Sequence, residues 1–195
     1  MVHSTDNLID PVAQRSLLRR RGIASREAMP AETHALLSAH IESHLDAELL
    51  QHAPAMLGFC WPFRGEFDAR PLVTRLLGLG WQACLPVVGE TIGPMVFRQW
   101  TPDTPMQADK HGIATPQQGA FVVPDILLLP FNVIDARGYR LGYGAGYFDR
   151  TLAVLDPRPF VIGVGFGLGV VASVYPQPHD IPVNCRVTET GICHF

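Results

Sequence analysis

Short apolar runs, separated by segments of helical pattern, constrain this chain most because they decide how its sheet is built. Residues 125–130 contain Ile-Leu-Leu-Leu, and the runs at 56–61, 83–88, 95–100 and 161–166 are also strand-like. A strand that is apolar at every position must be covered on both faces. The pattern therefore predicts an α/β fold in which helices cover both sides of a parallel or mixed sheet.

Helices are predicted between these runs. Apolar side chains recur every fourth position at Leu37, Ile41, Leu45 and Leu49, which places them on one face of a helix. Proline suits the first turn of a helix and glycine its end, so these residues mark several boundaries. The predicted helices span residues 12–21, 31–51, 71–78 (or 71–80) and 147–155, and no periodic element is predicted in residues 101–120.

Length and charge restrict what kind of protein this chain can be. Its 195 residues, 47% of them hydrophobic and 17% charged, suit one domain across residues 1–195, with residues 1–10 expected to form a flexible tail. A net charge of −3 excludes a broadly basic nucleic-acid-binding surface. The cations are 14 arginines and Lys110, so a bound anion must be held mostly by guanidinium groups. No secretory signal or membrane span is predicted, and we expect a cytoplasmic protein.

The motif R-L-G-Y-G-A-G-Y-F-D-R at residues 140–150 carries the strongest chemical signal. It lies between a predicted buried strand and a predicted helix. Glycines let backbone amides approach an anion closely, and the helix N-terminus adds positive potential. A phosphate-binding loop is one interpretation, and a structural turn is the other. Asp149 follows the loop, where a carboxylate can hold Mg²⁺ beside phosphates or simply stabilise the helix N-terminus.

Three further segments offer weaker candidates. In residues 61–68, Trp61 can stack on a flat ring and Glu66 can accept two hydrogen bonds from a heterocycle, although an ordinary surface turn is the simpler interpretation. Asp180, between two prolines, is either a metal or ligand contact or part of a polar loop. The arginines of residues 12–21 either bind a polyphosphate or form a solvated helix face. The four cysteines show no C-x-x-C spacing, so no zinc ribbon is indicated.

In combination, these segments resemble the 5-formyltetrahydrofolate cyclo-ligase family, also called methenyltetrahydrofolate synthetases. The resemblance covers nearly the whole chain, and the loop at 140–150 is its most specific part. It implies a three-layer α/β/α sandwich with a mostly parallel sheet, like that of ribose-phosphate isomerases and CoA transferases. The matching segments are, in order, a basic N-terminal helix, P-F-R-G-E-F-D, L-P-V-V, F-R-Q-W, G-I-A-T-P, P-D-I-L-L-L-P, the loop motif, I-G-V-G-F and P-H-D-I-P-V-N.

For function, the resemblance implies an ATP- and Mg²⁺-dependent ring closure. 5-Formyltetrahydrofolate becomes 5,10-methenyltetrahydrofolate through a phosphorylated formyl intermediate, and ADP and phosphate are released. The implied partners are small molecules, reduced folate and ATP, with no nucleic acid, membrane or obligate protein partner. By position, the resemblance implies that Arg140, Tyr147 and Asp149 are catalytic and that Asp149 and Asp180 bind Mg²⁺. It implies that folate is bound by Trp61, Glu66 and the residues from Tyr143 to Tyr147. The residues implied for ATP binding are Arg15, Arg19, Arg140, Leu141, Gly142, Tyr143, Gly144, Ala145, Gly146 and Tyr147.

The sequence departs from the family pattern at four positions. Arg15 stands where lysine is usual, Thr115 where glutamate is common, His111 where an aromatic is frequent, and Asn184 where the family has an aspartate. If that aspartate assists the metal, Asn184 should weaken Mg²⁺ binding. The alternative to an enzyme is therefore a folate- or nucleotide-binding protein without effective turnover. A sugar-phosphate isomerase on the same architecture is a third, weaker alternative.

Overall fold

The computed structural model describes residues 10–195, so the expected flexible tail lies, apart from Asp10, outside the described residues. Asp10 is instead the N-cap of the first helix, and its carboxylate accepts a hydrogen bond from Val12 N at 3.0 Å. The helices of this part of the chain are α1 (Pro11–Glu27), α2 (Ala31–Leu49), α3 (Arg70–Leu77), α4 (Tyr147–Val154) and the 3₁₀ turn η1 (Gly167–Gly169). Within residues 10–195, none of them combines the length and the apolar composition that a membrane span requires.

An eight-stranded sheet forms the middle of the molecule, in the order β13-β12-β10-β7-β1-β2-β3-β6. The five strands from β12 to β2 pair in parallel, whereas β13, β3 and β6 join the two edges antiparallel. A mostly parallel sheet is thereby confirmed. The strands are β1 (Met56–Gly58), β2 (Gln82–Val87), β3 (Val96–Trp100), β6 (Phe121–Val122), β7 (Ile126–Pro130), β10 (Phe160–Val164), β12 (Cys185–Thr188) and β13 (Gly191–His194).

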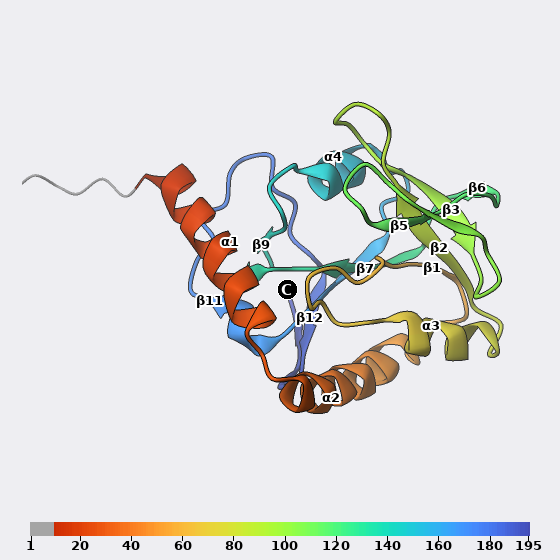
Figure 1. Ribbon diagram of the computed structural model, residues 1–195, viewed down its shortest axis with the longest axis horizontal. Coiled ribbons are helices and arrows are strands. Elements are labelled where there is room, and N and C mark those ends of the chain that lie inside the picture. The colour runs from red at the N-terminus through yellow and green to blue at the C-terminus, as the bar shows by residue number, and fades with distance from the viewer. Residues whose placement is uncertain (1–9) are drawn as a thin grey trace, which may run out of the picture.

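Helices cover both faces of this sheet (Figure 1). The side chains of β7 show why its sequence is apolar throughout: Ile126 and Leu128 pack with α2 and α3, while Leu127 and Leu129 pack on the opposite face with Leu152 of α4. The ladder of Ile41, Leu45 and Leu49 on α2 is fully buried, as its spacing predicts. The result is the expected three-layer arrangement.

Small strands outside the large sheet were not expected from the sequence. Residues 101–120 contain a hairpin of β4 (Met106–Ala108) and β5 (Ala114–Pro116), so the prediction that no regular element lies there is wrong. Two- and three-residue strands carry too little periodicity to be recognised. A three-stranded sheet of β8 (Val133–Asp135), β9 (Arg140–Leu141) and β11 (Val170–Val171) begins directly after β7.

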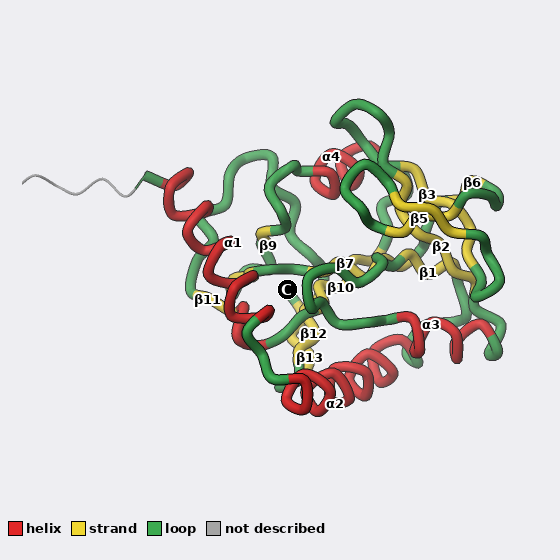
Figure 2. Tube along the Cα trace, viewed as in Figure 1, coloured by secondary structure: helices red, strands yellow, loops and turns green. Residues whose placement is uncertain are grey.

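Helix α1 continues to Glu27, so the predicted end at residue 21 is wrong. Gly22 does not terminate the helix; a Cβ atom at this position would lie 2.5 Å from the carbonyl oxygen of Asn132. The glycine therefore allows the helix to approach the segment after β7 closely. This contact sets α1 beside the loops that follow the carboxyl ends of the parallel strands (Figure 2).

Candidate active site

A cavity of about 930 Å³ lies among the segments that follow the carboxyl ends of β1, β2 and β7. Ligands of open α/β sheets bind at this end of the strands. Several stretches of chain meet there, among them the arginines of α1, residues 60–66, residues 85–88, residues 109–115, the glycine loop with the start of α4, and residues 177–180. The volume lies near the upper end of the usual range for small-molecule sites, as a site for two ligands requires.

Glu66 is the buried carboxylate of this cavity. It follows a turn in which Arg64 and Gly65 both have positive φ, of 51° and 73°. One carboxylate oxygen accepts Phe63 N at 3.1 Å and the other accepts the Tyr143 hydroxyl at 2.9 Å. Burial raises the pKa of Glu66, against the opposing effects of the Arg26 charge and these hydrogen bonds. Each oxygen still has a lone pair for a further donor.

Arg26 joins three parts of the site. Its side chain, 4% exposed, donates hydrogen bonds to Arg64 O at 3.0 Å, Asn132 Oδ1 at 2.8 Å and the Tyr143 hydroxyl at 2.9 Å. Its Nη2 atom lies 3.9 Å from Glu66 Oε1. The guanidinium therefore fixes the turn before Glu66, the segment after β7 and the glycine loop relative to one another.

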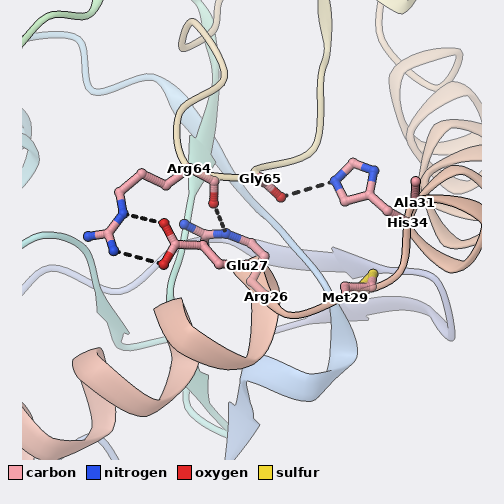
Figure 3. A pocket seen from close by; sticks show the side chains of 7 residues that line it. All are labelled: Arg26, Glu27, Met29, Ala31, His34, Arg64 and Gly65. Carbon is pink, nitrogen blue, oxygen red and sulfur yellow. Dashed lines mark hydrogen bonds and ion pairs between the residues drawn. The ribbon is translucent and has the colours of Figure 1, made fainter.

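A second, smaller hollow of about 450 Å³ lies behind this turn, between the end of α1 and the start of α2 (Figure 3). Glu27 accepts two hydrogen bonds from the Arg64 guanidinium, at 2.6 and 2.8 Å, and His34 Nε2 lies 3.0 Å from Gly65 O. These contacts hold the turn in place from its outer side. The hollow thus belongs to the support of Glu66.

The glycine loop passes Arg19 before it enters α4. Gly144 has a φ of 106°, and Gly146, the N-cap of α4, has a φ of 66°. A Cβ atom on Gly144 would lie 3.7 Å from Arg19 Nε, a buried atom that has no hydrogen-bond partner among the described residues. Burial and the nearby Arg15 charge lower the pKa of Arg19, and Asp180 opposes them. An unpartnered buried guanidinium nitrogen beside backbone amides is suited to an anion.

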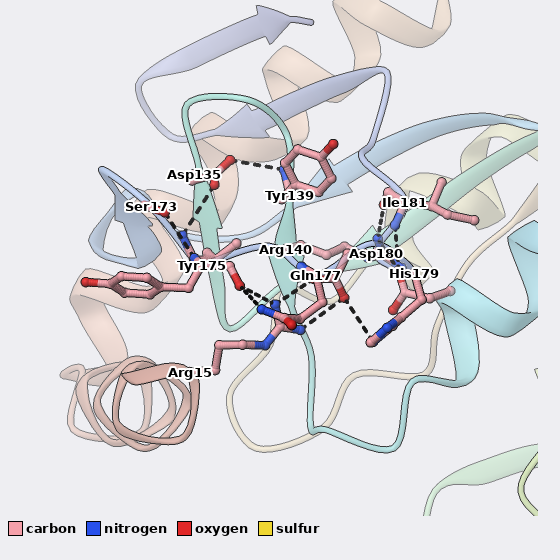
Figure 4. Close-up of polar contacts among 12 residues, drawn as sticks. Arg15, Asp135, Tyr139, Arg140, Ser173, Tyr175, Gln177, His179, Asp180 and Ile181 are labelled. Carbon is pink, nitrogen blue, oxygen red and sulfur yellow. Dashed lines mark hydrogen bonds and ion pairs between the residues drawn. The ribbon is translucent and has the colours of Figure 1, made fainter. Parts of the chain in front are cut away.

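Two arginine–aspartate pairs also line the cavity, and Figure 4 shows the first of them, Arg15 with Asp180. Arg15 donates to both carboxylate oxygens of Asp180, at 2.6 and 3.0 Å, and also to Tyr175 O. Burial acts to raise the pKa of Asp180, but hydrogen bonds from Arg15 and Gln177 N outweigh it, and the pKa is lowered. Arg140, 4% exposed, donates to Ile181 O at 2.7 Å, and its Nη1 lies 3.5 Å from Asp149 Oδ1.

The chain is similar in sequence to the proteins of one known family. The sequence model of the 5-formyltetrahydrofolate cyclo-ligase family matches residues 11–189. The chain belongs to this family. A 5-formyltetrahydrofolate cyclo-ligase of Haemophilus influenzae is 31% identical over 128 residues, which cover 62% of this chain and 68% of the relative. One from Escherichia coli K12 is 28% identical over 137 residues, covering 67% and 75%.

A solved structure agrees with this family membership. The NMR structure of Aquifex aeolicus 5,10-methenyltetrahydrofolate synthetase superposes with a TM-score of 0.79 at 28% sequence identity, and the match covers 92% of each chain. The mixed α/β architecture with its large, mostly parallel sheet is therefore that of a methenyltetrahydrofolate synthetase.

Every residue that the cyclo-ligase resemblance implied for the site lines the cavity, from Arg15 and Arg19 through Trp61, Glu66 and the loop to Asp149 and Asp180. Their individual roles stay predictions. Trp61 offers less free surface than expected, because the Arg70 guanidinium lies over its ring at 4.5 Å and Trp100 packs against it edge-on.

Three of the four departures from the cyclo-ligase pattern, Arg15, His111 and Thr115, lie in the cavity wall, and the fourth, Asn184, lies elsewhere. His111 Nε2 is 3.2 Å from the Tyr147 hydroxyl, and Thr115 donates to Pro86 O at 3.3 Å. Asn184 does not line the cavity; its side-chain oxygen accepts Val161 N at 2.8 Å, beside the amino end of β10. The structure does not support the expectation that Asn184 weakens metal binding, because the Asn184 side chain lies outside the cavity and bonds to the backbone of β10.

Arg26, Asn132 and His111 are the site residues that sequence reasoning missed or underrated. Arg26 lies beyond the predicted end of α1, and Asn132 lies in the short connection between β7 and β8. The available signal was the glycine at position 22, which marks a helix that packs closely rather than one that ends.

Proposed function

We propose that this protein is an ATP- and Mg²⁺-dependent 5-formyltetrahydrofolate cyclo-ligase, which converts 5-formyltetrahydrofolate and ATP into 5,10-methenyltetrahydrofolate, ADP and phosphate. The observation that carries the proposal is that one cavity contains both the buried Glu66 carboxylate and a glycine loop beside Arg19, whose Nε has no hydrogen-bond partner among the described residues. Family membership over residues 11–189 supports the same reaction.

Glu66 and Tyr143 suit the pterin half of the folate. A pterin ring presents adjacent N–H donors on one edge, and a carboxylate accepts two such bonds in parallel. The ring contact between Phe63 and Tyr143, with centroids 5.6 Å apart, provides an aromatic wall beside the carboxylate. Since Arg26 holds both Glu66 and Tyr143, the recognition edge is rigid before the ligand arrives.

Arg19, the glycine loop and the N-terminus of α4 suit the phosphates of ATP. Amide groups at a helix N-terminus bind anions without further charge. Arg19 Nε supplies an unused donor in the same place. Arg140 adds a buried positive charge on the far side of the loop. These groups would hold the nucleotide with its phosphates directed into the cavity that the folate shares.

The chemistry requires positioning and charge neutralisation rather than a protein nucleophile. The formyl oxygen attacks the γ-phosphorus and ADP leaves; N10 then attacks the activated carbon, loses its proton, and the C–O bond to phosphate breaks. Fixed arginines and amides stabilise the charge that moves during both steps. Cys60 lines the cavity, but burial and the Glu66 charge raise the pKa of its thiol well above the ordinary value, so it stays protonated.

For Mg²⁺, the residues present fit one carboxylate ligand. Mg²⁺ is usually held by one or two carboxylates together with phosphate oxygens and water. Asp149 Oδ1 accepts Ile181 N at 3.1 Å, and Oδ2 has no partner among the described residues. Both oxygens of Asp180 are engaged by Arg15. We therefore assign the metal contact to Asp149 and give Asp180 the role of positioning Arg15. Bound Mg²⁺ would neutralise phosphate charge.

The test mixes purified protein with 5-formyltetrahydrofolate and ATP, with and without Mg²⁺, and follows the near-ultraviolet absorbance of the methenyl product. We expect the signal to grow only when ATP and Mg²⁺ are both present. Binding of folate without product would favour the binding-protein alternative.

The Asp149→Asn variant separates the metal role from folate recognition. We expect turnover to fall by at least about 100-fold, because oriented charge contacts in a transition state contribute that much, while folate binding measured by calorimetry stays unchanged. Asp103→Asn, at an exposed position outside the cavity, is the matched control. Equal turnover in Asp149→Asn and the control would contradict the assignment.

A further inference from the structure

A cluster of metal-binding side chains lies outside the cavity, where α2 crosses the edge of the sheet. Cys185 of β12 and His194 of β13 are directly opposed in the antiparallel register. Opposed residues of two such strands project to the same face, with Cβ atoms about 4.5–5.5 Å apart. Glu48, in the last turn of α2, completes the group, and none of the three lines the cavity.

Glu48 is unusual because its carboxylate is buried and one of its oxygens accepts no hydrogen bond within residues 10–195. Its side chain is 2% exposed, and Oε2 has no hydrogen-bond partner among residues 10–195. The nearest basic groups are His194 Nε2, 3.3 Å from Oε2, and His52 Nε2, 3.9 Å from Oε1. A buried anion requires a compensating charge. A cation at this point would supply it.

The three side chains offer one sulfur, one nitrogen and one oxygen ligand. One ligand atom from each lies within 4.8 Å of the others, so small side-chain rotations would bring them around a common ion. Zn²⁺ is bound by this mixed set, whereas Mg²⁺ prefers oxygen ligands alone. His194, with a side chain 59% exposed, faces the open side and leaves room for entry of the ion and for a water as fourth ligand.

We propose that Glu48, Cys185 and His194 form a second metal site, separate from the cavity, which takes Zn²⁺ or a cation of similar softness and ties β13 to α2. Cysteine binds a metal as the thiolate, so binding forms a metal–sulfur bond and releases the Cys185 thiol proton to solvent.

The test uses the full chain after dialysis against a chelator, titrated with Co²⁺ and with Zn²⁺ in competition with a chromophoric chelator. We expect one equivalent of Co²⁺ to produce a thiolate-to-cobalt charge-transfer band, which Zn²⁺ abolishes and excess Mg²⁺ leaves unchanged. Cys185→Ser should remove the band. His194→Asn, at an exposed position that tolerates substitution, should weaken Zn²⁺ binding at least about 100-fold.

Matched controls distinguish the cluster from its neighbours. Cys193→Ser changes the adjacent residue of β13, which alternation directs to the other face, and His40→Asn changes an exposed histidine of α2. Both controls should bind Zn²⁺ as the unaltered protein does. The proposal is overturned if no charge-transfer band forms, or if His194→Asn binds Zn²⁺ as tightly as the His40→Asn control; in either case Glu48 and His194 are only an ion pair. Ring-closure activity is not a readout, so the outcome is independent of the proposed function.

Discussion

The pKa of the Glu66 carboxyl is raised, so its proposed role in folate recognition can be tested by varying pH. Because burial raises the pKa of Glu66, the carboxyl takes up a proton at a higher pH than an exposed glutamate does. In the proposed function, folate binding needs the ionised form of Glu66, and we therefore expect the dissociation constant to rise as pH falls through that pKa. Glu66→Gln should weaken folate binding about 10- to 100-fold at neutral pH, given about 1.5–3 kcal/mol for hydrogen bonds to a charged group.

Calorimetric titration of folate against pH checks this prediction. Glu66→Gln should flatten the pH profile while ATP binding stays unchanged. Glu42→Gln, at a glutamate on the outer side of α2 that pairs with Arg75, should keep the profile of the unaltered protein. A larger effect of Glu66→Gln on ATP than on folate would contradict the pterin assignment.

Arg26 is expected to position the folate site without touching the reacting atoms. Arg26→Lys keeps the charge but loses the planar fork that reaches Arg64 O, Asn132 and Tyr143 together. We expect the folate KM to rise about tenfold with a smaller change in kcat, and the free energy of unfolding to fall by about 1–3 kcal/mol, the cost of leaving buried groups unpaired.

Steady-state kinetics and denaturant unfolding measure the two effects of Arg26→Lys. The control is Arg20→Lys, at an exposed arginine of the same helix whose side chain, within residues 10–195, donates a hydrogen bond to Ser16 alone. A loss confined to kcat, with the folate KM unchanged, would show that Arg26 acts on the chemical step instead.

At the scale of the elements, two variants of the glycine loop distinguish the effect of backbone strain on stability from the effect of a lost ligand contact on binding. Gly144 has a φ of 106°, so Gly144→Ala should cost about 1–3 kcal/mol of stability. Gly142 has no positive φ, and a Cβ there would meet no atom within 4 Å. We therefore expect Gly142→Ala to leave thermal stability unchanged but to weaken ATP binding about tenfold, because the added methyl group enters the space beside the amides.

Thermal unfolding and calorimetry with ATP check both glycine variants. If Gly142→Ala bound ATP normally, the loop would be a structural turn, which is the alternative that the sequence left open.

How well each element was predicted depends on its length and on how regular its apolar pattern is. The long α2 and the apolar β7 were predicted correctly, because periodicity and burial on two faces leave a strong pattern. β12 and β13 were missed, since they mix Arg186, Thr188 and His194 with apolar residues and have no clear period. The predicted end of α1 at residue 21 was wrong, because the helix continues to Glu27 with Gly22 inside it at a close contact with Asn132.

At the scale of the whole molecule, the sequence predicted the layers and the loop of the site but not the contacts between distant segments. Glu66 and Tyr143 are both evident as candidates, yet their hydrogen bond spans 77 positions of sequence. The pairing of Arg15 with Asp180 spans 165. Such pairs follow from the three-dimensional packing of elements, and a single sequence holds no local pattern for them.

The Arg15–Asp180 pair should therefore contribute to the stability of the whole chain, since it ties the first helix to the segment before β12. The pKa of Asp180 is lowered in the folded protein, so its contribution is present above the unfolded pKa, about 3.9, and is lost as pH falls through the lower folded value. Asp180→Asn should reduce the free energy of unfolding by about 1.5–3 kcal/mol at neutral pH. Denaturant unfolding of both proteins across pH should show this difference constant down to about pH 4 and shrinking below it. A difference that instead disappeared between pH 8 and pH 6 would mean that another group, and not the Asp180 carboxylate, holds α1 in place.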